Sequence, residues 1–129
     1  MKKMLFCGLA PAALLALTIS QANAAGEHIA PMQEVAKTKV ATWLKSSVVI
    51  DAIKAQNAKN ASLAEPEIIK MDKIWRAEVK VSGGSLTKSV LANSLSKYLK
   101  KVKADSQGLY TEIFVMDNKG INVGQSDMT

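Results

Sequence analysis

Residues 109–126, LYTEIFVMDNKGINVGQS, carry the clearest strand signal in this chain of 129 residues. The first part, residues 109–116, is rich in β-branched and aromatic side chains, which favour β-strands. The polar residues 117–120 follow, and Gly120 can take the positive φ that a tight turn requires. Residues 121–126 then return as a second strand. The stretch therefore predicts a β-hairpin.

A long helix is expected near the N-terminus. Apolar residues recur at three- and four-residue steps from Ile29 to Val48, which is the spacing of one helix face. The pattern extends over residues 27–57, and Ser46 and Ser47 are the places where it can bend or break. Such a helix would be long for a domain of this size.

Two further helices are expected before the hairpin. Pro66 lies between two glutamates, a combination that suits a first helical turn, and the spacing predicts a helix to about residue 79. Residues 75–81 also alternate as a strand would, but the helical spacing is favoured. After the Ser-Gly-Gly-Ser break at residues 82–85, a third helix is expected with Ser85 as its cap.

The composition leaves few routes to catalysis. The chain has one histidine, His28, and one cysteine, Cys7, and it contains no phosphate-binding glycine loop or nucleophile motif. A carboxylate pair, Glu112 with Asp72, is conceivable for a hydrolase, but solvated carboxylates are the simpler interpretation. The formal charge is +6. Its densest part, residues 97–103, is interpreted as a solvated helix face, not as a nucleic-acid site. We therefore expect no enzyme, no metal and no cofactor.

The first 24 residues have the pattern of a cleaved export signal. Lys2 and Lys3 precede an apolar run at residues 5–19, and residues 22–24, Ala-Asn-Ala, fit a signal peptidase site. The apolar run is short for a membrane span and contains Pro11. The sequence predicts a periplasmic protein of residues 25–129 that forms a single domain.

The order of these elements resembles a known family. A long N-terminal helix, a second helix carrying Asp-x-x-Trp-Arg at residues 72–76, a third helix and the hairpin resemble the Cache, or PDC-type, extracytoplasmic sensor domains of chemoreceptors and histidine kinases. The resemblance covers about residues 30–129. It implies a PAS-like antiparallel sheet with the long helix packed along it. It also implies a pocket for a small ligand such as a carboxylate or an amino acid.

Five residues are candidates for that pocket. Trp75 can supply an aromatic wall and Arg76 an anion clamp, although a core tryptophan beside an exposed arginine is the simpler interpretation. Tyr110, Glu112 and Phe114 share one strand face if the alternation of period two holds. The same face could simply pack on a helix.

The expected fold is therefore α+β, with three helices and a hairpin that form the N-terminal part of a Cache-like domain. The family sheet has further strands after the hairpin, so residues 25–129 are expected to be incomplete at the C-terminus. The expected function is ligand sensing or binding, with signalling through a membrane receptor or histidine kinase. The alternative is an interaction protein whose free strand edge pairs with another chain, for example as a homo-oligomer.

Overall fold

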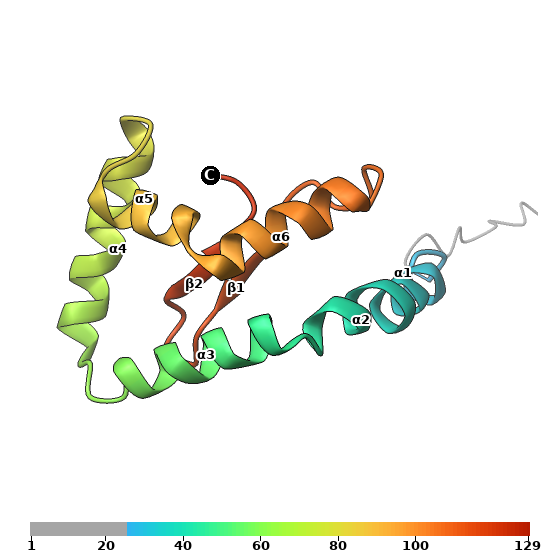
Figure 1. Ribbon diagram of the computed structural model, residues 1–129, viewed down its shortest axis with the longest axis horizontal. Helices are drawn as coiled ribbons and strands as arrows, with labels where there is room; N and C mark the ends of the chain where they lie inside the picture. The colour runs from blue at the N-terminus through green and yellow to red at the C-terminus, as the bar shows by residue number, and fades with distance from the viewer. Residues whose placement is uncertain (1–25) are drawn as a thin grey trace, which may run out of the picture.

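The computed structural model describes residues 26–129, and the predicted export signal, residues 1–24, lies outside the described residues. The described part is α+β, as expected: helices surround a two-stranded antiparallel sheet. Figure 1 shows the sheet between α3, α4 and the consecutive helices α5 and α6, while α1 and α2 extend away from it.

The N-terminal helical run is interrupted at Ser46, one of the two serines at which the sequence predicted a bend or break. α1 (Ile29–Val35), a π-helical turn η1 (Ala36–Val40) and α2 (Ala41–Leu44) form its first part, and α3 (Ser47–Lys59) its second. Ser46 between them is extended, with φ −63° and ψ 138°.

The apolar stripe of the first part contributes little to the core: no residue of α1, η1 or α2 is buried, although Trp43 packs against the core from α2. Ile29 and Met32 are more than half exposed, and the first fully buried side chain of the run is Val49 in α3. The break at Ser46 ends the phase of the N-terminal stripe, so α3 presents a different set of positions to the sheet.

α4 (Glu65–Lys80) begins and ends where the sequence placed it. Pro66 occupies its first turn, and the Glu67 carboxylate accepts a hydrogen bond from the backbone N–H of Ala64 at 3.0 Å. The competing strand pattern of residues 75–81 forms no strand. The helix ends in a turn in which Ser82 and Gly83 have positive φ values of 61° and 113°.

The third predicted helix is in fact two, α5 (Ser85–Ala92) and α6 (Ser94–Asp105). Asn93 separates them in an extended conformation, with ψ 166°, and its Oδ1 accepts from the N–H of Ser96 at 2.8 Å. The predicted cap, Ser85, is instead the first residue of α5. The carboxylate of Glu78 in α4 accepts from the N–H groups of Leu86 and Thr87 at 3.1 and 2.7 Å.

The hairpin is shorter than predicted. β1 (Phe114–Met116) and β2 (Asn122–Gln125) pair antiparallel, with Val115 opposite Gly124 and Met116 opposite Asn122. Val123 is thus an extra residue, a bulge on β2. One rung lies beyond β1, where Ile113 C=O accepts from Ser126 N–H at 2.8 Å. Residues 109–112 have no partner strand among the described residues, so they form no strand despite their composition.

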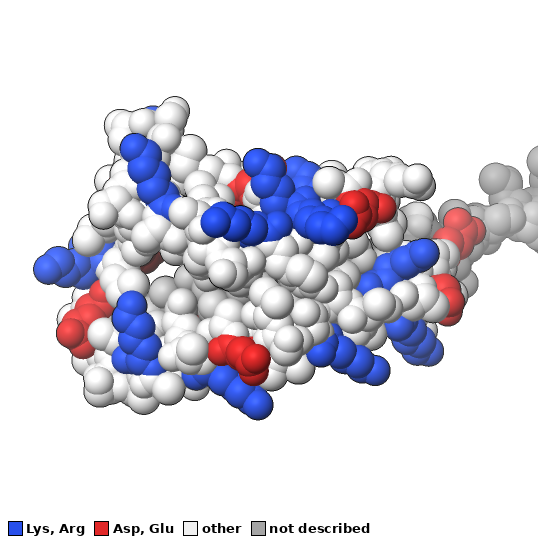
Figure 2. All heavy atoms as spheres, in the orientation of Figure 1, with Lys and Arg blue, Asp and Glu red and all other residues white. Residues whose placement is uncertain are grey.

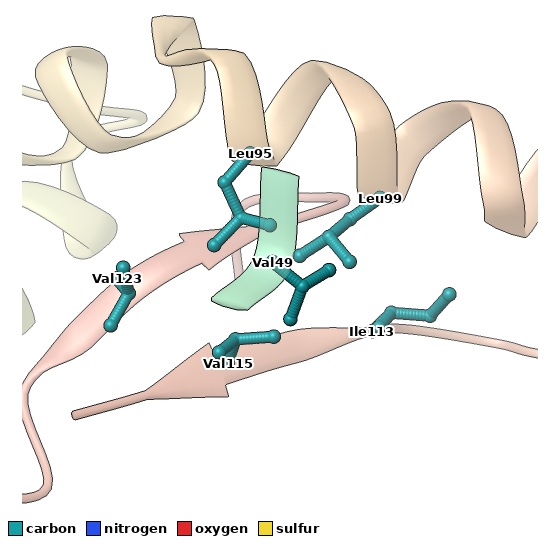
Figure 3. Packing of buried hydrophobic residues seen from close by; sticks show 6 residues of the cluster. All are labelled: Val49, Leu95, Leu99, Ile113, Val115 and Val123. Carbon is teal, nitrogen blue, oxygen red and sulfur yellow. The ribbon is translucent and has the colours of Figure 1, made fainter. Parts of the chain in front are cut away.

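The core covers one face of this sheet. It consists of Val49, Leu95, Leu99, Ile113, Val115 and Val123. Figure 3 shows these side chains converging between α3, α6 and the two strands. Gly124 lies under α6, where an added Cβ would come within 2.8 Å of Leu95 Cγ. The opposite face of the sheet is not covered in this way.

The lysines of α6 lie on the outside of the molecule. Figure 2 shows basic side chains gathered over this helix, where Lys97, Lys100 and Lys101 are exposed. Lys101 pairs with Asp105 at 2.8 Å, and Lys103 pairs with Asp127 at 2.6 Å. Among residues 26–129, none of the helices combines the length and the apolar character that a membrane crossing would need.

Candidate functional site

A groove of about 460 Å³ lies between α4 and the sheet face opposite the core; we call it the α4 groove. Its apolar lining comes from α4, α5 and β1: Ile68, Met71, Trp75, Leu86, Val90, Phe114 and Met116. The groove is open to solvent, because Phe114 is 53% exposed and Met116 is 50% exposed. Large apolar side chains left exposed in a concave site are typical of a surface that binds something.

One wall of the α4 groove is a face of the helix α4, and the other wall is a face of the strand β1. Ile68, Met71 and Trp75 follow one another at three- and four-residue steps, so they share one face of α4. Phe114 and Met116 alternate with the core residue Val115, so they point to the other side of the sheet. The aromatic side chains of both walls therefore line the same space.

Polar side chains of β2 lie beside Phe114 and Met116. Gln125 is paired with Phe114 and Asn122 with Met116, so all four belong to the groove face. The Asn122 amide donates to Gln125 Oε1, a contact between residues three apart that the bulge at Val123 permits. Asn122 Oδ1 is buried and has no hydrogen-bond partner among the described residues.

One end of the groove is closed by the hairpin turn, which Asp117 organises. Its carboxylate accepts from Asn60 Nδ2 at 2.7 Å, from Gln56 Nε2 at 3.1 Å, and from the N–H groups of Lys119 and Ile121 at 2.9 Å. Burial alone would raise the pKa of Asp117, but these hydrogen bonds outweigh it and lower the pKa below its usual value. The turn is thereby fixed to the C-terminal end of α3.

Three of the five predicted pocket residues meet in the groove. Trp75, Glu112 and Phe114 all line it, Trp75 from α4 and the other two from the β1 side. Glu112 accepts a hydrogen bond from the hydroxyl of Thr129, which also lines the groove.

The other two predicted residues lie outside the groove. The Arg76 side chain is 73% exposed and does not line the groove, but it pairs at 2.9 Å with Asp72, which does. Adjacent helix positions point about 100° apart, so Trp75 and Arg76 cannot both face the sheet. The Tyr110 hydroxyl accepts from Trp43 Nε1 at 3.4 Å, and the two rings meet edge to face. Tyr110 precedes the paired strand, so the alternation that links Glu112 with Phe114 does not reach it.

Several lining residues were missed from the sequence. The spacing of Met71 from Ile68 and Trp75 indicates one helix face, but nothing in the sequence shows that this face lines a groove and not a core. Asn122 and Gln125 could be placed only with knowledge of the bulge. Leu86 and Val90 lie on α5, whose separation from α6 was not foreseen.

The two carboxylates considered for a hydrolase, Glu112 and Asp72, both line the groove, but Asp72 is engaged by Arg76. Within residues 26–129 no cluster of three His, Cys, Asp or Glu side chains could hold a metal ion. Comparison with protein-family models, curated proteins and solved structures finds no match.

Proposed function

We propose that this protein is an exported small-ligand-binding module that works as a sensor, similar in role to Cache or PDC-type domains. The observation that supports the proposal is the α4 groove: a solvent-open space of about 460 Å³, with Trp75 and Phe114 on its walls and polar side chains on its floor. A space of this size matches the pockets that small molecules occupy in proteins.

The ligand class follows from the lining. Glu112 offers a carboxylate beside an aromatic side chain, Phe114, and the opposite wall offers the indole of Trp75. A carboxylate accepts charge-assisted hydrogen bonds from an ammonium group, and aromatic faces attract cations as well as apolar groups. An amino acid with an apolar side chain satisfies both features, and it is the ligand that we propose.

Signalling would follow from a ligand that contacts α4 and the sheet at once. Such a ligand binds more tightly to the arrangement in which the two walls are closer, and it shifts the population toward that arrangement. Gln56 of α3 and Asn60 at its C-terminal end are hydrogen-bonded to the hairpin turn. α1 and α2 precede α3 in the chain, and none of their side chains is buried. These exposed helices are the surface that we propose for a membrane receptor or histidine kinase partner.

A binding experiment can use the two tryptophans as separate reporters. The chain contains only Trp43 and Trp75, so Trp43→Phe leaves the groove residue as the sole tryptophan and Trp75→Phe leaves the distant one. Amino acids and carboxylates without an amino group are titrated into each variant. An amino acid should change the fluorescence of Trp43→Phe and leave that of Trp75→Phe unchanged. Equal responses of both variants, or no response to any compound, would refute the proposal.

Two further variants test the role of individual groups. Glu112→Gln should weaken amino acid binding by about tenfold or more, because a hydrogen bond to a charged group is lost. Lys73→Ala is the matched control on α4 and should leave the affinity unchanged, since its side chain is exposed and does not line the groove. If Lys73→Ala weakened binding and Glu112→Gln did not, the ligand would contact a different surface.

The proposed export can be measured independently. We expect the protein in the periplasmic fraction of a bacterial host, with Ala25 as its first residue. Full-length protein retained in the cytoplasm would contradict the proposed location.

A further inference from the structure

The two outer edges of the sheet differ, and the β2 edge is closed. Gln125 N–H, which points away from β1, donates to Ser96 Oγ at 2.9 Å. Val123 C=O accepts from Asn93 Nδ2 at 2.8 Å, and Asn122 C=O accepts from Gln56 Nε2 at 3.2 Å. The bulge at Val123 further distorts this edge. No other strand can add to β2 without displacing these side chains.

The β1 edge, in contrast, is open. Ile113, Val115 and Asp117 direct their backbone groups toward the partner strand, as the rungs at both ends of the hairpin show. Phe114 and Met116 must then direct theirs outward, because backbone groups alternate along a strand. Within residues 26–129 no hydrogen bond occupies the outward N–H and C=O groups of Phe114 and Met116. Four backbone groups on the outer edge of β1 are thus available to a further strand.

Apart from its length of three residues, β1 has none of the features that usually protect such an edge. Natural edge strands carry lysine, proline, an inward-pointing charge or a bulge, each of which prevents another strand from adding. The segment Phe114–Met116 has none of these four features. The side chains of Phe114 and Met116, on the groove face of the sheet, are large, apolar and half exposed.

We propose that the β1 edge pairs with the β1 edge of a second copy of this chain. The open groups are symmetric about Val115, so a two-fold axis at that residue pairs each Phe114 with Met116 of the other copy. All eight backbone groups are then satisfied at once, which gives a four-stranded antiparallel sheet.

Side chains are also compatible in this register. Phe114 and Met116 lie on one face, where they would contact each other across the new strand pair and lose their exposure. Glu112 would come opposite Asn118, so no like charges meet. This inference rests on the strand edge and does not depend on a ligand in the α4 groove.

Sedimentation equilibrium of the purified chain is the first test. The mass should approach twice that of one chain as the concentration rises. Met116→Pro removes an outward N–H, which proline tolerates on an edge strand, and should give only monomer. Met116→Thr keeps the N–H and the strand propensity, so it should retain the dimer. A monomer at every concentration, or a Met116→Pro variant that is folded by circular dichroism and still dimeric, would overturn the proposal.

Cysteine cross-linking tests the register, whether or not the proline variant folds. On a Cys7→Ser background, Phe114→Cys and Met116→Cys are prepared as separate single variants and then mixed. Paired residues in this register have Cα atoms about 5.5 Å apart, which suits a disulfide, whereas identical residues lie about 7–8 Å apart on the diagonal. The mixture should form a cross-linked dimer and each variant alone should not. Cross-links within one variant alone, or none in the mixture, would refute the proposed pairing.

Discussion

Replacing Gly124 with alanine should loosen the packing of α6 on the hairpin. The new Cβ would lie 2.8 Å from Leu95 Cγ, 3.0 Å from Leu95 Cδ2 and 3.1 Å from Ser96 Oγ. Leu95 is 2% exposed, and Ser96 Oγ is held by bonds to Val90 C=O and Gln125 N–H. Neither neighbour can move away freely. An extra methyl group in a filled core costs about 1–3 kcal/mol of the free energy of unfolding, and we expect this range here.

Urea unfolding followed by tryptophan fluorescence and circular dichroism measures this cost. Gly26→Ala is the matched control, because an added Cβ at that position meets nothing within 4 Å, and it should change the unfolding free energy by less than about 0.5 kcal/mol. On a Leu95→Ala background, the effect of Gly124→Ala should largely disappear, since the clashing side chain is gone. An unchanged urea midpoint for Gly124→Ala would refute the close packing described above.

Three other substitutions test separate contacts. Leu99→Ala should lower the unfolding free energy by about 2–5 kcal/mol in the same urea assay, because Leu99 is fully buried and its loss leaves a cavity. The folded-state pKa of Asp117 is lowered, so its contribution is present above its ordinary pKa of about 4 and is lost as the pH falls through the lower folded value. Asp117→Asn should therefore lower the melting temperature at pH 7, and it should weaken the fall of the melting temperature as the pH drops below about 4. Glu78→Gln should lower the helix signal and the melting temperature at pH 7, because the charged carboxylate that accepts the N–H groups of α5 is removed.

The fold could be predicted from the sequence wherever local signals decide the structure. Pro66 with its flanking glutamates located the start of α4, and Gly120 located the hairpin turn, since each depends only on neighbouring residues. Ser46 likewise marked the break before α3. The α+β class follows from these elements together.

Long-range contacts explain what could not be predicted. Asn93 divides α5 from α6 because its amide bonds to Val123, thirty residues later, and no local pattern contains that partner. Residues 109–112 have strand composition but no partner strand among the described residues. In the candidate site, Tyr110 was misplaced for this reason, and Arg76 because a helix turns its neighbour away from the groove.

Asn93 serves two parts of the molecule with one side chain. Its Oδ1 caps α6 by accepting from Ser96 N–H, and its Nδ2 donates to Val123 C=O of β2, both at 2.8 Å. The two hydrogen bonds of this side chain connect the first turn of α6 directly to β2. The backbone amides of α6 and β2 should therefore exchange with deuterium at similar rates, through a single opening event, and Asn93→Ala should separate the two sets of rates.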